Sequence, residues 1–469
     1  MRLPVIIQGG MGVGVSSWRL ARAVAEQGQL GVVSGTALDQ VLVRRLQDGD
    51  QGGHIRRALD HFPFPAMAAR VWDRFHIPGG KPENQSYVRL PLHVKDNPRE
   101  MQELCIVGNF VEVFLAKEGH TNQIAINYLE KIQVPHLPSI YGALLAGVDA
   151  VIMGAGIPLR LPGSLDLLAA NQPATYPLYV IGAGPDDDTL MHFNPADYIE
   201  GAPPELKRPY CLPIIASNTL ALTLVKKANG RVDGFVIEGP TAGGHNAPPR
   251  GKMQLNDQGE PIYGERDVVD LAKMRELGLP FWLAGGFGSA EKLKEALAEG
   301  AAGIQVGTPF AFCEESGLQP EFKQALLASD PKLKTDPLAS PTGFPFKVVQ
   351  MSGTVAVSDT YNERPRICDL GYLREAYKTP DGAIDYRCAG EPVSLYESKG
   401  GKPEDAAGRM CLCNGLMANI GLGQVRGGGR HHEPGLITAG DDVATVKRFL
   451  KPGQTTYTAA DVIQTLLGN

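Results

Sequence analysis

The sequence lacks the features that mark several protein classes. Its 45 lysines and arginines are outnumbered by 51 aspartates and glutamates, which gives a net charge of −6. It therefore has no basic excess with which to bind nucleic acid or an anionic membrane. Its longest apolar stretches, such as 178–183, are far shorter than the roughly 18 residues of a membrane-spanning helix. With 43% hydrophobic and 20% charged residues, the chain is also not of the disordered type.

Cysteine is sparse as well. Seven cysteines in 469 residues are an odd and low number, which argues against a secreted disulfide framework. The N-terminus runs from Met1 directly into the apolar segment 5–7, without the basic and apolar regions of a signal peptide. We therefore expect a soluble, cytoplasmic protein with no nucleic-acid or membrane partner. Whether it forms a homo-oligomer stays open.

Glycine is in excess, at 56 of 469 residues, or about 12% against a usual value of about 7%. Much of it follows short apolar segments that alternate with helical patterns. Segments 5–8, 17–27 and 30–34 predict strand, helix and strand, and the pattern returns at 213–237 and 281–306. Glycines at 9–12, 239–244, 285–286 and 307 each follow such a strand. Barrel enzymes build their sites at these carboxyl ends of the strands.

This organisation predicts an α/β fold over residues 1–330. The periodicity alone fits a doubly wound sheet as well as a closed barrel, and the glycines at the strand ends favour the barrel, of the TIM-type (β/α)8 class. Three stretches do not fit the repeat and are predicted to be insertions, at about 40–100, 157–210 and 246–265. Residues 331–469 are turn-rich and hold four of the seven cysteines. We expect them to form an appended C-terminal module.

Two glycine loops are predicted to hold a phosphate. Gly285-Gly286 and Gly307-Thr308 are separated by one strand-helix unit, and they follow the last two predicted strands before the C-terminal portion. Glycine-rich turns that lead into helices bind anions through backbone amides, and barrels often bind phosphate at their seventh and eighth strands. The alternative is that the glycines only permit tight turns. The presence of two such loops next to each other favours a phosphate-binding site.

The order and spacing of five segments resemble the nitronate monooxygenase family, formerly called 2-nitropropane dioxygenases. These segments are 6–12, 108–109, 238–245, 284–287 and 306–310. The family also includes FMN-dependent enoyl-acyl carrier protein reductases and NADH:quinone reductases. The resemblance covers residues 1 to about 315, with interruptions, and implies a TIM-type barrel that binds one FMN noncovalently.

The resemblance also assigns roles to matching residues. Some relatives carry a lysine where this chain has Ser217-Asn218, so no lysine role is carried over, and Ser217 is counted among the cofactor-binding residues. The resemblance implies that Gly10, Met11 and Gly12 line the isoalloxazine ring, that Asn109 hydrogen-bonds it, and that Gly243, Gly244, Gly286, Gly307 and Thr308 hold the ribityl phosphate. Gly285, in the same loop as Gly286, is counted among the cofactor-binding residues.

His245 is the candidate catalytic residue. It ends the segment Thr241-Ala242-Gly243-Gly244-His245, and histidine changes its charge near neutral pH. We expect it to transfer a proton or to bind an anionic substrate. Glu238 either orients His245 or is a buried strand carboxylate, and the sequence leaves both open. The other nine histidines are expected in loops or on the surface.

Three functions stay open. In the first, a small anionic substrate reduces the FMN, and dioxygen reoxidises it, as in a nitronate monooxygenase. In the second, NADH or NADPH reduces the FMN, which then reduces an enoyl thioester or a quinone. In the third, the chain is a subunit of a multienzyme assembly that docks through its C-terminal module.

Four cysteines cluster near the C-terminus: Cys368, Cys388, Cys411 and Cys413. Four thiolates are the ligand number of an iron-sulfur cluster or a tetrahedral zinc, although Cys411 and Cys413 are spaced too closely for a standard zinc motif. Reduced structural cysteines without metal are the third possibility. Cys105, Cys211 and Cys313 are expected to be core residues.

Overall fold

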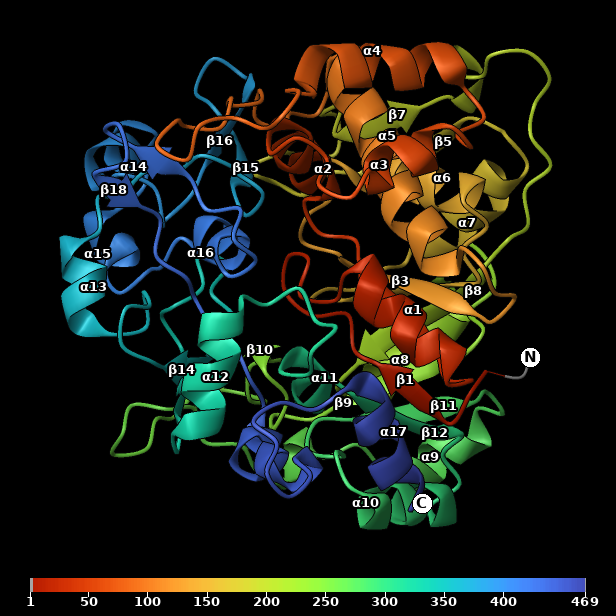
Figure 1. Ribbon diagram of the computed structural model, residues 1–469, viewed down its shortest axis with the longest axis vertical. Coiled ribbons are helices and arrows are strands. Elements are labelled where there is room, and N and C mark those ends of the chain that lie inside the picture. Colours follow the sequence, from red (N-terminus) through yellow and green to blue (C-terminus); the bar gives the residue numbers. More distant parts are fainter. Residues whose placement is uncertain (1–2, 469) are drawn as a thin grey trace.

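A computed structural model describes residues 3–468, and at its centre eight parallel strands form a barrel (Figure 1). The order of the strands in the sheet is β1-β12-β11-β9-β8-β4-β3-β2. The predicted TIM-type barrel is confirmed. The strands are β1 (Ile6–Gln8), β2 (Gly31–Ser34), β3 (Ile124–Leu129), β4 (Ala150–Gly154), β8 (Tyr210–Ile215), β9 (Phe235–Glu238), β11 (Phe281–Ala284) and β12 (Gly303–Val306).

The barrel closes where its first strand meets the start of its second. The amide of Gln8 donates to Leu30 O over 3.0 Å, and the amide of Leu30 donates to Ile6 O over 3.1 Å. On its other side β1 pairs with β12, with Ile6 opposite Ile304. Side chains from alternating positions fill the interior, and Trp282, 1% exposed, donates from Nε1 to Pro4 O over 3.0 Å. The inside of the barrel is thus packed, as in other barrels of this type.

Helices cover the outside of the barrel. The amphipathic pattern of residues 17–27 forms α1, with Leu20, Ala21, Val24 and Ala25 buried on one face as predicted. The strand-helix-strand units near 213–237 and 281–306 are confirmed with ends shifted by three residues or fewer. The helices are α1 (Trp18–Glu26), α5 (Arg99–Lys117), α6 (His136–Leu145), α7 (Leu161–Ala169), α8 (Asn218–Lys227), α9 (Leu271–Glu276), α10 (Ala290–Ala298) and α17 (Ala459–Leu467).

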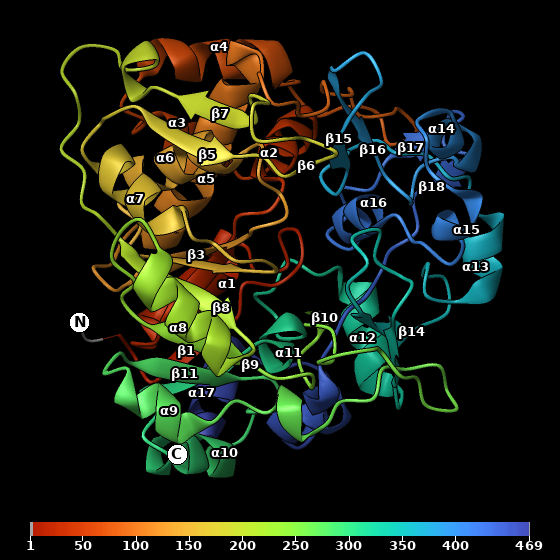
Figure 2. The ribbon, with the colours of Figure 1, turned by 180° about the vertical axis from the view of Figure 1, so that it is seen from behind.

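The helix that follows the eighth strand comes from the end of the chain. Helix α17 contacts α1 and α10, and both views show it beside them (Figures 1 and 2). Its buried residues Val462, Ile463 and Leu466 belong to the same core as the barrel residues around them. About 150 residues therefore separate β12 from the helix that completes its unit.

The first two predicted insertions contain regular structure of their own. Residues 40–100 include α2 (Leu38–Gln47), α3 (His54–Leu59) and α4 (Pro65–Phe75). Residues 157–210 include, besides α7, the strands β5 (Ala174–Pro177), β6 (Val180–Ile181) and β7 (Leu190–Phe193) and a short 3-10 helix, Pro195–Asp197. Strand β6 pairs with the C-terminal strand β15, with Val180 opposite Ala376. This insertion therefore forms part of a sheet with the C-terminal region.

The C-terminal region forms short elements on one side of the barrel (Figures 1 and 2). Leu370, Tyr372 and Met417 share a core with α2 and α5, and Val443 and Phe449 share the core of the barrel shell. The boundary at residue 330 stays a prediction. Besides α17, the elements after β12 are α11 (Thr308–Ala311), α12 (Pro320–Ala328), β13 (Lys332–Asp336), β14 (Phe346–Gln350), α13 (Ser358–Glu363), β15 (Glu375–Lys378), β16 (Ile384–Arg387), α14 (Val393–Ser398), α15 (Pro403–Ala406), α16 (Leu412–Ala418), β17 (Val425–Arg426), β18 (His431–His432) and a 3-10 helix, Asp441–Phe449.

Single residues confirm and correct the predictions for the core. Cys105, Cys211 and Cys313 are all buried, as expected. His136 was expected in a loop or on the surface, and this is wrong: it is buried at the start of α6. Its Nε2 lies 3.0 Å from Leu129 O, and burial lowers its pKa to about 4.

Among the described residues, no helix is both long and apolar enough to cross a membrane.

Candidate active site

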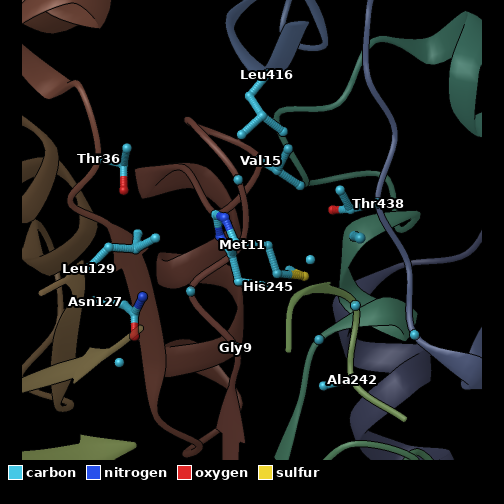
Figure 3. Close-up of a pocket in the computed structure, with 18 of the residues that line it drawn as sticks. Gly9, Met11, Val15, Thr36, Asn127, Leu129, Ala242, His245, Leu416 and Thr438 are labelled. Atoms are coloured by element: carbon cyan, nitrogen blue, oxygen red, sulfur yellow. The ribbon is translucent and has the colours of Figure 1, made fainter. Parts of the chain in front are cut away.

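A cavity of about 240 Å³ opens at the carboxyl ends of the barrel strands (Figure 3). Its walls come from the loops after β1, β9, β11 and β12, from β3, and from the C-terminal segment 437–442. Of the residues predicted to bind the cofactor or substrate, the cavity is lined by Gly10, Met11, Gly12, Gly243, Gly244, His245, Gly285, Gly286, Gly307 and Thr308.

The loop after β1 is held in place by two buried polar side chains. Ser16 Oγ accepts from the amide of Met11 over 2.9 Å and donates to Gly9 O over 2.8 Å. Gln8 Nε2 donates to Ser16 Oγ over 2.8 Å. Because Ser16 and Gln8 are both fully buried, these bonds fix the path of the loop before any ligand binds. Met11 is thereby directed toward the loop after β12: a Cβ on Gly307 would lie 3.4 Å from Met11 Sδ.

Asn109 does not line this cavity. It is buried in α5, where Nδ2 donates to Cys105 O over 2.8 Å and Oδ1 accepts from the Tyr128 hydroxyl over 2.9 Å. The preceding Gly108 allows α5 to pack closely on α2, since a Cβ there would lie 2.6 Å from Leu38 O. The structure thus gives the Gly108-Asn109 motif a packing function, and the predicted contact of Asn109 with a flavin has no support in its position.

Asn127, which the sequence analysis missed, points into the cavity from β3 (Figure 3). It lies against the loop after β1, and a Cβ on Gly10 would be only 2.3 Å from Asn127 Cβ. Position 10 must therefore be glycine for these two segments to meet. The signal was present in the sequence, because Asn127 is a polar residue within the apolar strand 124–129.

The two predicted phosphate loops are neighbours in space, because β11 and β12 pair directly. Gly285 and Gly286 have φ angles of +84° and +74°, a conformation that other residues adopt only with strain. A Cβ on Gly285 would lie 3.0 Å from Thr241 Oγ1, so the loop after β9 packs against the loop after β11. Three consecutive barrel loops meet at this end of the cavity.

The C-terminal segment closes the same end. The amide of Gly440 donates to Thr308 Oγ1 over 2.8 Å, and the amide of Asp441 donates to Thr241 O over 2.9 Å. Asp442 lines the cavity and accepts from the amide of Gly288 over 3.1 Å. Burial raises the pKa of Asp442. The segment 437–442 lies about 130 residues or more after the glycine loops in the sequence. No local sequence pattern indicated that it would form this wall of the cavity.

Ser217 lies away from the cavity. Its Oγ accepts from the amide of Leu220 over 3.1 Å and caps the start of α8. This is the usual use of a serine before a helix. Its predicted cofactor contact has no support in this position.

His245 lies in the cavity on the two-residue strand β10 (Gly244–His245), which pairs with β14 opposite Phe346. Its Nε2 is 2.7 Å from Ser340 Oγ, and its ring meets Phe346 edge-on at a centroid distance of 4.7 Å. Burial, and after it the positive charge of Lys131, lower the pKa of His245 to about 3. The imidazole is therefore neutral at pH 7.

Glu238 lines the cavity at the end of β9. Burial raises its pKa to about 7. Among residues 3–468 no hydrogen bond joins its carboxyl to His245, so the structure does not support Glu238 as the residue that orients the imidazole. It is instead a titratable acid of the cavity wall.

Two further polar atoms of the cavity wall are buried and have no hydrogen-bond partner within the described part of the chain. They are Gln305 Oε1, from β12, and Thr36 Oγ1, from the loop after β2. Buried polar atoms are normally paired, so these two are available to a ligand. Gln305 resembles Asn127 in being a polar residue within an apolar strand.

A family model matches the second half of the barrel, and known proteins match parts of the chain. Residues 205–337 match the family model described as nitronate monooxygenase. A probable nitronate monooxygenase of Bacillus subtilis (strain 168) is 35% identical over 139 residues, 29% of this chain and 38% of that protein. A nitronate monooxygenase of Pseudomonas aeruginosa is 35% identical over 98 residues, 20% of this chain and 25% of that protein. These matches relate the chain to the nitronate monooxygenase family and confirm the resemblance.

The matches have a limited extent. They span less than two fifths of the length of these two relatives. The family model covers His245 and both glycine loops of the phosphate end, and it does not reach the loop after β1. Among solved structures, FabK from Thermotoga maritima aligns over 99% of this chain and 92% of its own, with 14% identity and a TM-score of 0.48.

Proposed function

We propose that this protein is an FMN-dependent oxidoreductase whose active site is the cavity at the carboxyl ends of the barrel strands. The observation that carries the proposal is the meeting of the loops after β9, β11 and β12 around one end of the cavity, within the segment that matches the family model. Because these loops are rich in glycine, their backbones would let a phosphate approach closely.

The residues present fit FMN. Gly285, Gly286, Gly307 and Thr308 would hold the phosphate, as in other barrels that use their last two strands for this purpose. Asn127, from β3, and the unpaired Gln305 Oε1, from β12, offer hydrogen-bonding groups of the kind that a flavin ring needs. When bound, FMN supplies the transfer of electrons from one substrate to another.

The protein's own part in the reaction centres on His245. A neutral imidazole binds a small anion by donating a hydrogen bond. The anion then raises the pKa of the imidazole, because an opposite charge favours the protonated form. His245 can therefore hold a proton at the substrate during the reaction even though its pKa is about 3 before the substrate binds. Ser340, which is fully buried, fixes the ring through Nε2.

The substrate we favour is a small nitronate, oxidised with dioxygen as the final electron acceptor. This choice rests on the matches to nitronate monooxygenases and on the anion-binding role of His245. A reductase that takes hydride from NADH or NADPH uses the same FMN site, and the experiment below separates the two.

The test is to purify the protein with its flavin and to mix it with one reductant at a time in the absence of dioxygen. We expect a nitronate alone to bleach the flavin absorbance, and the colour to return when air is admitted. Bleaching by NADH or NADPH but not by a nitronate would show a reductase. A purified protein that neither contains nor binds FMN would contradict the whole proposal.

A further inference from the structure

The described residues contain one close group of metal-ligating side chains, and the C-terminal cysteines are not part of it. Among residues 3–468, the group of three or more such side chains whose ligand atoms all lie within 4.8 Å of one another is Asp39, His93 and Cys105. Both ring nitrogens of His93 already have partners, since Nε2 lies 3.0 Å from Asp39 Oδ2 and Nδ1 lies 3.0 Å from Asn97 Nδ2. A metal at the C-terminal cysteines stays a prediction: Cys368, Cys388, Cys411 and Cys413.

A different part of the C-terminal region reaches the candidate catalytic residue. The turn between β13 and β14 lies beside His245 and contains Ser340, which is fully buried. Arg409 Nη1 donates to Ser340 O over 2.7 Å and holds this turn from one side. From the barrel side, Lys131 Nζ lies 3.9 Å from the centroid of the Phe344 ring. The position of the Ser340 hydroxyl is therefore set by contacts on both sides of the turn.

The Ser340 hydroxyl links His245 to a second hydroxyl. Ser340 Oγ lies 2.7 Å from His245 Nε2 and 2.8 Å from Thr342 Oγ1, and it also accepts from the amide of Thr342 over 3.2 Å. Thr342 Oγ1 lies 3.4 Å from His245 Nε2 and accepts from the amide of Phe344 over 3.5 Å. Two hydroxyl groups therefore meet one ring nitrogen.

The hydrogen atoms of this network decide which ring nitrogen of His245 is protonated. Each hydroxyl has one hydrogen to donate, and a neutral imidazole donates from one nitrogen and accepts at the other. If Nε2 accepts, Thr342 donates to Ser340 and Ser340 donates to His245, so both hydroxyls are paired. If Nε2 carries the proton, one of the two hydroxyls has no acceptor among residues 3–468. The first arrangement is favoured, because an unpaired buried donor costs free energy.

The other ring nitrogen, Nδ1, is left for a ligand. Within the described part of the chain no hydrogen bond involves His245 Nδ1, and the residue lines the cavity. The imidazole is held edge-on against Phe344 and Phe346, at centroid distances of 6.4 and 4.7 Å. The pairing of β10 with β14 fixes the backbone of His245 as well. The ring is thus positioned before a substrate enters.

We propose that Ser340, with Thr342 behind it, holds His245 as the tautomer that carries its proton on Nδ1 and so directs an N–H donor at the substrate. Ser340 is then a positioning residue supplied from 95 positions further along the chain. The inference rests on the proposed function, because it assumes that His245 acts on an anionic substrate. A histidine in the wrong tautomer offers such a substrate a lone pair in place of a hydrogen.

The test reads the tautomer directly in the full-length protein. Histidine labelled with nitrogen-15 is incorporated, and long-range proton-nitrogen NMR correlations at pH 7 distinguish a protonated ring nitrogen from a bare one. The signals of His245 are those missing from the His245→Asn spectrum. We expect Nδ1 to be protonated and Nε2 to be bare. A proton on Nε2 in the wild type overturns the proposal.

Variants show which side chains set the tautomer. Ser340→Ala removes the donor to Nε2, so we expect a population with the proton on Nε2 to appear, and Thr342→Val should change the tautomer in the same direction. Ser164→Ala is the matched control, because Ser164 is also buried but its hydroxyl donates to Arg160 O on α7, and it should keep the wild-type tautomer. Circular dichroism checks the fold of each variant. A folded Ser340→Ala protein with the wild-type tautomer overturns the proposal, and an unchanged tautomer in Thr342→Val removes Thr342 from it.

Turnover gives a second measurement. At equal flavin content, we expect kcat with a nitronate to fall by about tenfold to 10³-fold in Ser340→Ala and to stay unchanged in Ser164→Ala. An unchanged kcat in a Ser340→Ala protein whose tautomer has shifted would overturn the link to the substrate. The NMR measurement needs neither flavin nor substrate, so a failure of the proposed function is distinguishable from a failure of the tautomer assignment.

Discussion

His245 shows how far the surroundings of one side chain change its chemistry. A histidine in water has a pKa of about 6.5, and in this cavity burial and Lys131 lower the value to about 3. We expect His245→Asn to keep its flavin but to slow turnover by on the order of 10² to 10⁴, the range for a group that transfers a proton. His192→Asn, an exposed histidine on β7, is the control. The measurement is kcat with a nitronate at fixed flavin content, and an unchanged kcat in the His245 variant would remove this residue from the mechanism.

Glu238 is expected to make stability depend on pH. Its pKa rises from an ordinary value of 4.5 to about 7 on folding, so between these values the folded state holds more protons than the unfolded state. The free energy of unfolding therefore falls as the pH rises through this window. His245 acts in the opposite direction, because its pKa is lowered on folding.

Glu238→Gln isolates the contribution of the carboxyl. We expect the variant to gain stability relative to the wild type between pH 5 and pH 8, on the order of 1 to 3 kcal/mol. Urea unfolding of both flavin-free proteins at several pH values measures this. A constant difference across the range would show that Glu238 titrates normally.

Among the elements, the loop after β11 is expected to bind phosphate through its backbone. Gly286→Ala places a side chain at a φ of +74° and 3.3 Å from Thr241 Oγ1. Gly278→Ala is the matched control, since its φ is +68° and nothing lies within 4 Å of its Cβ. Both variants should lose about 1 to 2 kcal/mol of stability through backbone strain. Only Gly286→Ala should weaken FMN binding, by about tenfold or more, and equal dissociation constants in a titration would contradict the phosphate assignment.

Helix α17 allows an equally direct comparison, because two leucines are adjacent on it. Leu466 is 1% exposed in the core shared with α1 and α10, whereas Leu467 is 39% exposed. We expect Leu466→Ala to lower the free energy of unfolding by about 2 to 5 kcal/mol. Leu467→Ala should change it by about 0.5 kcal/mol or less. Similar losses in urea unfolding would show that α17 does not pack on the barrel in solution.

At the scale of the whole molecule, the barrel and the C-terminal region are expected to fold together. Residues after 330 supply α17, the cavity wall at 437–442 and parts of two hydrophobic cores. A fragment of residues 1–330 would expose these apolar surfaces, so we expect it to be aggregated or to lack a cooperative thermal transition. Coexpression with residues 331–469 should restore a folded complex. A soluble 1–330 fragment that unfolds cooperatively and binds FMN would instead support two independent domains.

The sequence alone determined the parts of this protein that depend on short segments. The periodic spacing of apolar residues predicted the strands and helices of three βα units, and the glycines that follow strands predicted the loops of the cavity. These signals are local because a strand or turn is specified by neighbouring residues. Asn127 and Gln305 belong to the same group, because a polar residue within an apolar strand is itself a local signal.

Only the tertiary structure decided which distant segments meet. It placed Asn109 in a helix packing contact and Asn127 in the cavity, brought residues 437–442 over the glycine loops, and supplied the eighth outer helix from the end of the chain. It also set the pKa values of His245 and Glu238. These properties depend on burial and on neighbours up to several hundred residues away, and no local pattern encodes such contacts.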